Sequence, residues 1–480
     1  MKICKRIYPL LFTAALLSIT SCKLTRPIPH ASSIKAPSNF PSQTDSAGIG
    51  AIKWSSFFTD NHLIALIDTA LQNNLDLKMA VQRIEMARSN VMISQGALLP
   101  SVNAEISGGG RKFGDYTMDG VGNYDTNFSE NINDDRRIPG PVLPDYFVGL
   151  RSSWEVDIWG KLKTQRKGAY NRFLASEKAR QAITTSLVAQ VAGYYYELIK
   201  LDTELNIIKK NIALQESAVE TVRIQKEGGR ANELAVKQFV AQLLNTRSLE
   251  IEINQKIYET ENSLNLLIGR FPQSITRGKI LEQKFPVQIH AGIPSQMLRR
   301  RPDVQQAELE MLGNYADQQA AQLAFLPSLN ITALFGFNSF KSGLLFNPAS
   351  LAFNALGGLA APVLNRKALR AGQKRTEAAS LESLYAYNKT ILTGFQEVST
   401  SLKKIENTQK IADFKREEVA VLQQAVTTSR DLFVTGYATY LEIILAQKNV
   451  LEAELTLTNV QKEQNLALVE LYRAVGGGWE

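Results

Sequence analysis

The sequence has few of the side chains that build metal sites and disulfide frameworks. Its 480 residues include two cysteines, Cys4 and Cys22, both at the start of the chain. The three histidines, His30, His62 and His290, are far apart. A disulfide framework or a cysteine-based metal site is therefore excluded from the body of the chain. No Ser/His/Asp grouping or nucleotide-binding loop is visible either, so we expect no enzymatic activity, no metal and no cofactor.

Strong charge of either sign is also absent. The chain has 54 Lys and Arg against 46 Asp and Glu, a net charge of +8, with 44% hydrophobic and 21% charged residues. This composition excludes wholesale disorder and provides enough apolar material for a core. Three of the cations lie within residues 1–21, so removal of that segment would leave a net charge of +5. Such a small excess gives no support for a nucleic-acid partner.

The first residues form an export signal. A basic start precedes the apolar stretch from Leu10 to Ile19, which is too short to span a bilayer as a helix. Small residues then lead to Cys22, a pattern that resembles a bacterial lipoprotein signal. This predicts a signal peptide at 1–21, acylation of Cys22 (palmitate among the chains) and a Pro-, Ser- and Ala-rich tether at 22–52. A plain secretory signal with an incidental cysteine is the alternative.

The rest of the chain is internally duplicated. Leu98 to Asn103 matches Phe325 to Asn330 at an offset of 227, and Gly229 matches Gly436 at an offset of 207. The second offset also pairs Leu264 with Leu471 and Gly269 with Gly476. The sequence therefore predicts a first repeat at 53–269, a connector at 270–302 and a second repeat at 303–480. The first repeat has about twenty extra residues, which we place in a polar loop at 108–144 that includes three successive glycines.

Each repeat predicts the same order of elements. A helix of about 20 residues, near 78–98 or 303–325, is stopped by a proline and followed by a strand in which polar and apolar residues alternate. The predicted second strands are 146–156 and 350–361. One apolar face holds Val102, Ala104 and Ile106, then Val148, Leu150, Trp154 and Val156, and then Leu329, Ile331, Ala333 and Phe335.

Two very long helices complete each repeat. No proline occurs between Pro144 and Pro272 or after Pro362, and a heptad pattern of apolar residues indicates coiled-coil packing. The predicted helix at 163–226 would be about 95 Å long. Gly229 and Gly436 mark the helix-hairpin tips, from which partner helices return at 231–268 and 438–472.

The strands also make a membrane argument. Strands of about ten residues can cross an outer membrane when tilted, but four strands leave open edges that hydrocarbon does not tolerate. Several copies must therefore share one barrel, and their helices would line up as a second tube. The fold class is α+β and duplicated. A soluble β-sandwich with a coiled-coil stalk is the alternative from periodicity alone.

A family resemblance adds to these predictions. The mid-chain segment Gly292 to Asp303, the C-terminal Leu471 to Trp479 and the early Trp54 to Asn74 resemble the TolC-like outer-membrane efflux family, in its lipoprotein branch that serves resistance–nodulation–division multidrug pumps. The resemblance implies a homotrimer in the bacterial outer membrane, with a 12-stranded β-barrel and a periplasmic α-barrel. It also implies two partners, a periplasmic adaptor and an inner-membrane pump. Arg301-Pro302-Asp303 is interpreted as a structural helix start.

The same resemblance locates a gate. It places Leu441, Glu442 and Leu445 at the closed periplasmic constriction, and the hairpin tips at 222–234 and 431–441 where the adaptor docks. Many relatives have Asp where this chain has Leu445, so one acidic ring is replaced by an apolar residue. The alternative for Glu442 is an ordinary solvated helix residue.

The function implied is a passive exit duct for small molecules such as drugs and toxic compounds. Two alternatives remain. One is the exit duct of a type I protein secretion system, and the other is a non-conducting coiled-coil surface scaffold.

Overall fold

A computed structural model describes residues 49–140, 142–279, 294–364 and 366–480. The predicted signal peptide, Cys22, most of the tether and part of the connector lie outside the described residues. None of the described helices is long and apolar enough to cross a membrane.

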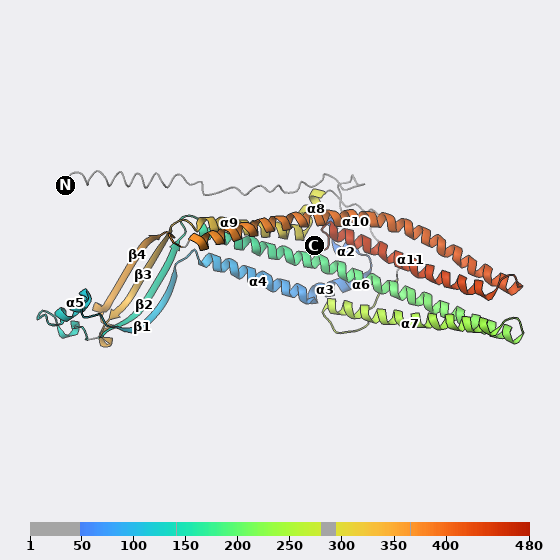
Figure 1. Ribbon diagram of the computed structural model, residues 1–480, viewed down its shortest axis with the longest axis horizontal. Helices are drawn as coiled ribbons and strands as arrows, with labels where there is room; N and C mark the ends of the chain where they lie inside the picture. Colours follow the sequence, from blue (N-terminus) through green and yellow to red (C-terminus); the bar gives the residue numbers. More distant parts are fainter. Residues whose placement is uncertain (1–48, 141, 280–293, 365) are drawn as a thin grey trace. The chain divides into compact units, whose positions relative to one another are not determined.

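The predicted order of elements is confirmed (Figure 1). The first repeat holds α2 (Trp54–Phe57), α3 (Asn61–Asn73), α4 (Leu75–Gly96), β1 (Ser101–Arg111), α5 (Met118–Asn127), β2 (Leu143–Val156), α6 (Lys161–Glu227) and α7 (Glu233–Ile268). The second holds α9 (Pro302–Leu323), β3 (Ser328–Ser339), β4 (Leu351–Ala360), α10 (Arg366–Thr435) and α11 (Tyr440–Ala474), preceded by α8 (Pro294–Arg300). Short 3₁₀ turns lie at Ile49–Ala51, Asp134–Arg136, Ser342–Leu344 and Pro348–Ser350.

One part of the prediction was wrong. The segment at 108–144 is not a continuous loop, because Gly108, Gly109 and Gly110 lie in β1 and α5 occupies Met118–Asn127. Glycine is disfavoured in strands, but here the three glycines lie in register with β2, opposite Tyr146, Asp145 and Pro144. Thr117 caps α5 by accepting from the Gly120 N–H at 3.1 Å.

The chain divides into two compact units that cut across the repeats. Among the described residues, the sheet unit comprises 86–173 and 311–383, and the helical unit comprises 49–85, 174–310 and 384–480. The repeat-based domain boundaries therefore stay a prediction.

The sheet unit contains one antiparallel sheet in the order β1-β2-β3-β4. Ile106, Val148, Phe337 and Leu351 lie side by side across the four strands. Within the described chain, β1 and β4 each pair on one side only. All strand ends that lead to helices lie at one end of the sheet, because β1 and β3 enter from α4 and α9 while β2 and β4 leave to α6 and α10.

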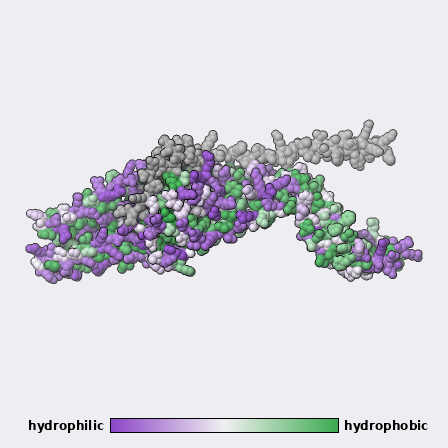
Figure 2. Space-filling model, turned by 180° about the vertical axis from the view of Figure 1, so that it is seen from behind, coloured by the Kyte–Doolittle hydropathy of each residue, from purple (hydrophilic) through white to green (hydrophobic). Residues whose placement is uncertain are grey.

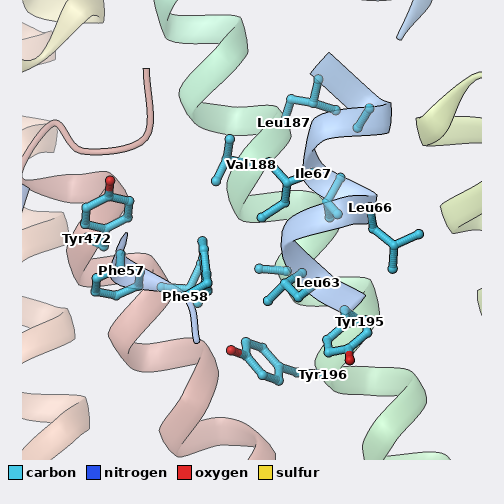
Figure 3. Close-up of a cluster of buried hydrophobic side chains, with 14 of the residues drawn as sticks. Phe57, Phe58, Leu63, Leu66, Ile67, Leu187, Val188, Tyr195, Tyr196 and Tyr472 are labelled. Atoms are coloured by element: carbon cyan, nitrogen blue, oxygen red, sulfur yellow. The ribbon is translucent and has the colours of Figure 1, made fainter. Parts of the chain in front are cut away.

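The core of the helical unit forms around α2 and α3 (Figure 3). Leu63 and Ile67 of α3 pack against Leu187 and Val188 of α6. The Phe57 ring stacks on Tyr472 of α11, with centroids 4.1 Å apart. These short N-terminal helices therefore hold α6 and α11 together.

The long helices end in the same way in both repeats. Gly229, Gly269, Gly436 and Gly476 adopt φ values of 71°, 77°, 85° and 87°. At each, the glycine N–H donates three residues back and the next N–H donates five residues back, the Schellman pattern. Their spacing follows the 207-residue offset, so the duplication extends to the helix caps.

A second matched feature joins helix ends to each other. The Asn74 Nδ2 donates to the Leu267 carbonyl at 2.8 Å, so the start of α4 is tied to the end of α7. The Arg301 Nη1 donates to the Ala474 carbonyl at 2.9 Å, so the start of α9 is tied to the end of α11. Asn74 and Arg301 are 227 residues apart, and the two carbonyls are 207 apart.

Candidate functional site

The sheet has one apolar and one polar face. Residues directly opposite each other in antiparallel strands share a face, so the register assigns every side chain. Exposed Ile106 (84%) and Phe353 (81%) show how open the apolar face is. Figure 2 shows hydrophobic atoms gathered over the sheet. The apolar face holds Val102, Ala104, Ile106, Tyr146, Val148, Leu150, Trp154, Val156, Leu329, Ile331, Ala333, Phe335, Phe337, Leu351, Phe353, Ala355 and Leu359.

The opposite face carries most of the polar side chains of the sheet, together with Phe147, Leu334 and Leu356. Ser101, Asn103 and Glu105 of β1 lie there, and the Arg151 guanidinium of β2 donates to Glu105 with an Nε–Oε2 distance of 2.5 Å. A sheet with this division needs an apolar medium on one side and water on the other. The alternation predicted from the sequence is confirmed in β1, β2 and β3. In β4 the second face is mixed, because Asn354 lies there beside Ala352, Leu356 and Ala360.

The hairpin tips are built by capped turns. The α6–α7 tip runs through Gly229 to Asn232, whose side chain accepts from the Ala235 N–H at 2.9 Å. The α10–α11 tip runs through Gly436 to Thr439, which is the N-cap of α11. A cluster that includes Val222, Phe239 and Ile443 packs the two hairpins together near their tips. Gly229 and Gly436 therefore lie at the turns, as predicted.

The predicted gate residues lie in the first two turns of α11. Leu441 and Leu445 are each 48% exposed, whereas Ile443 between them is buried in the tip cluster. Glu442 is exposed. The single chain thus places the three predicted residues on one accessible side of α11, beside the tip, and their role in a gate stays a prediction.

Glu442 also has a structural role that sequence reasoning missed. Its carboxylate accepts from the Thr439 N–H at 2.9 Å and from the Thr439 hydroxyl, which completes a capping box. The hydrogen bond from the Thr439 hydroxyl, followed by that from its own backbone N–H, lowers the pKa of Glu442. The pattern Thr-x-x-Glu at the start of a helix was a signal that could have revealed this role.

Arg301 is the centre of a buried ion network. It is 4% exposed, and its guanidinium donates to Asp303 at 2.6 Å and 3.0 Å and to Glu397 of α10 at 2.6 Å. Arg473 donates to the other oxygen of Glu397 at 2.8 Å. Burial opposes the charge on Glu397, but the bonds from Arg473 and Arg301 outweigh it and lower the pKa of this carboxyl. The predicted helix start at Pro302 and Asp303 is confirmed.

The described part of the chain contains no group of three or more His, Cys, Asp or Glu side chains that could hold a metal ion.

Comparison with known proteins gives a family. The model of the outer membrane efflux protein family matches residues 66–270 and 293–477. The chain is 28% identical over 430 residues to the cation efflux system protein CusC of Escherichia coli O6:H1, covering 89% of this chain and 88% of CusC. It is 28% identical over 476 residues to the pyoverdine export outer membrane protein OpmQ of Pseudomonas aeruginosa, covering 97% and 96%.

Solved structures agree with this match. A membrane protein from Pseudomonas aeruginosa superposes with a TM-score of 0.80 at 25% identity, covering 92% of this chain and 99% of that chain. A crystal structure of CusC gives a TM-score of 0.79 at 26% identity, covering 95% and 98%. The family model covers most of the sequence, so this chain belongs to the outer membrane efflux protein family and is the outer-membrane channel of an efflux system.

Proposed function

We propose that three copies of this chain form a passive, gated duct that carries small molecules across the outer membrane. An inner-membrane pump of the resistance–nodulation–division type would deliver them through a periplasmic adaptor. The observation that carries the proposal is the sheet, with one apolar face, one face that holds most of its polar side chains and, within the described residues, an unpaired edge at both β1 and β4. Three such sheets, with β1 of one copy paired to β4 of the next, would close a 12-stranded barrel without open edges.

The helices support the same ring. Leu244, Ile251 and Tyr258 are exposed at heptad spacing on α7, and Phe414 and Val421 are exposed at heptad spacing on α10. Apolar residues at heptad spacing are the pattern that packs one helix against another. We infer that α7 of one copy packs against α10 of the next, so that four helices from each copy complete a 12-helix tunnel.

The gate would lie at Leu441, Glu442 and Leu445. In a threefold ring, Glu442 carboxylates would attract cations, and their mutual repulsion would favour opening. Leu441 and Leu445 would supply the apolar part of the constriction. The lowered pKa of Glu442 supports this, because the side chain stays charged while it caps α11.

The hairpin tips would receive the adaptor. Tyr437, Val434, Ile224 and Leu234 are exposed at or beside the two turns. Exposed apolar side chains at the end of a coiled coil can pack against the end of another helical hairpin. Cys22, predicted as a lipid anchor, fits a relative from Salmonella typhimurium that is described as a probable outer membrane lipoprotein.

The choice of transported molecule does not lie in this chain. Similar relatives are named for efflux of cations, pyoverdine and toluene. A duct with one architecture and several cargoes leaves selection to the pump. Protein secretion and a non-conducting scaffold, the two alternatives from the sequence, have no specific observation in their favour.

Conductance of the purified full-length protein in planar bilayers tests the proposal. We expect the trimer to give discrete single-channel conductance steps with a preference for cations. Glu442→Gln should keep the capping box, since glutamine retains an acceptor at this position, and should reduce the cation preference severalfold. Glu417→Gln, at an exposed position of α10, is the matched control and should change neither property.

Each negative result has a definite meaning. A monomer without conductance would overturn the duct and support the scaffold. Channels whose ion preference is the same in wild type and Glu442→Gln would remove Glu442 from the gate.

A further inference from the structure

Two basic faces begin the long helices immediately after the sheet. On α6, Lys163, Arg166 and Lys167 are exposed at spacings of three and four residues, which places them on one side of the helix. On α10, four exposed cations also share one side: Arg366, Lys367, Arg370 and Lys374. Arg375, which is exposed as well, lies on the opposite side of the helix. We call these two groups the basic faces. They occupy equivalent positions in the two repeats.

The side chains of the basic faces lack ion-pair partners among the described residues. Within the part that the structure describes, none of these seven side chains makes an ion pair or a hydrogen bond. Their neighbours are paired, since Lys161 contacts Glu155 at 2.5 Å and Arg172 contacts Asp317 at 2.8 Å. The sequence has no acidic residue at 158–176 or at 318–376. Cations in the first turn of a helix also oppose the helix dipole, so an anion there stabilises them. At the start of α6 the Asp157 carboxylate accepts from the Leu162 and Lys163 N–H groups. The first turn of α10 has no acidic residue, so an external anion would stabilise Arg366 and Lys367.

An apolar step connects the sheet to each basic face. Exposed Ile158 and Trp159 precede α6, and exposed Val363 and Leu364 precede α10, with Leu364 at 96%. The Trp159 indole donates to the Pro327 carbonyl at 2.7 Å, which fixes its orientation. The order along the chain is therefore apolar strand, aromatic or aliphatic step, and then cations. This is the order expected where a protein leaves hydrocarbon and meets lipid headgroups.

The other end of the sheet differs. The connection between β1 and β2, residues 112–142, has six acidic and three basic side chains. The excess of cations is thus confined to the end of the sheet where the helices begin.

We propose that the basic faces bind the phosphate headgroups of anionic phospholipids in the periplasm-facing leaflet of the outer membrane. The proposal rests on the proposed function, which puts the apolar sheet face in hydrocarbon. Charge complementarity and the chain order, in which exposed apolar residues lie between the strands and the cations, select a lipid surface as the occupant. The basic faces hold the duct at a fixed depth, because each cation gains affinity only at the headgroup level.

Competitive fluorescence quenching tests this in vesicles. Full-length protein is reconstituted in phosphatidylcholine with increasing brominated phosphatidylglycerol, and quenching of the tryptophans beside the sheet reports local enrichment. A surface cation contributes about fivefold in affinity for anionic lipid. We therefore expect the triple variant Lys163→Gln/Arg166→Gln/Lys167→Gln to show a phosphatidylglycerol preference at least about fivefold lower than wild type.

The control has the same loss of charge elsewhere. Lys209→Gln/Lys210→Gln/Lys256→Gln removes three exposed cations from the helical unit and should keep the wild-type preference. Equal preference in the two triple variants would overturn the proposal. So would a loss of trimer in the α6 variant without a change in lipid preference, since that result assigns the basic face to acids of a neighbouring copy.

Conductance of the same preparations separates this proposal from the proposed function. Wild-type channels without any preference for phosphatidylglycerol would overturn the lipid contact and leave the duct intact. Absence of both conductance and quenching would overturn the duct itself.

Discussion

Glu397 shows how one carboxyl ties three parts of the helical unit together. It accepts from Arg301 at the start of α9 and from Arg473 at the end of α11. Its partners are 96 and 76 residues away along the chain, so no local pattern could reveal the network. The sequence predicted the helix start at Pro302 correctly but could not predict that Arg301 is buried.

This network makes stability depend on pH. The pKa of Glu397 lies below its ordinary value of 4.5 in the folded chain, so its contribution is complete above about 4.5 and is lost as pH falls through the lower folded value. Thermal scans between pH 7 and pH 3 should show a steeper loss of Tm below pH 4.5 in wild type than in Glu397→Gln. The exposed-site variant Glu417→Gln should follow wild type. Parallel curves for wild type and Glu397→Gln would exclude this contribution.

At the scale of elements, the periodicity of apolar residues and the positions of glycine and proline predicted most of the secondary structure. The long helices, the four strands and the tips followed from heptads, alternation and glycine, because these signals reflect local geometry. The strand through Gly108, Gly109 and Gly110 did not follow, since its pairing with β2 overrides the low strand propensity of glycine. The α5 helix lay in a segment whose polar residues indicated a loop.

Two glycines with similar backbones should respond differently to alanine. Gly229 has φ 71° and nothing within 4 Å of an added Cβ. Gly229→Ala should therefore lower the free energy of unfolding by about 1 kcal/mol, from backbone strain alone. Gly269 has φ 77°, and an added Cβ would lie 2.7 Å from the Asn73 carbonyl oxygen. Gly269→Ala should therefore lower Tm clearly more. Equal losses in calorimetry would show that the junction between α7 and α3 relaxes freely.

At the scale of the whole molecule, the two faces of the sheet determine which surroundings the folded chain needs. Its two faces were predictable because alternation fixes a face from the sequence alone. The gate was not, because a ring of Glu442 is a property of several copies and a single chain shows only the exposed side chain. The same limit applies to the partner helices at the exposed stripes of α7 and α10.

A charge placed on one or the other face of β4 tests whether the apolar face lies in hydrocarbon. Phe353→Arg puts a cation on the apolar face, where about 2–4 kcal/mol would be lost near the middle of a bilayer. Asn354→Arg puts the same side chain on the polar face, one residue away. We expect the first to reduce sharply the detergent-resistant trimer recovered from outer membranes and the second to leave it near wild type. Similar recovery of both variants would contradict an apolar surrounding for this face.

The matched helix ends, with the same capped glycine turns 207 residues apart, have a consequence for stoichiometry. In the proposed trimer the main chain at the tips repeats six times around the axis, whereas the side chains repeat three times. A binding partner that recognises the backbone of a turn would find six nearly identical binding sites. One that recognises Tyr437, found at one kind of tip and replaced by Arg230 at the other, meets only three.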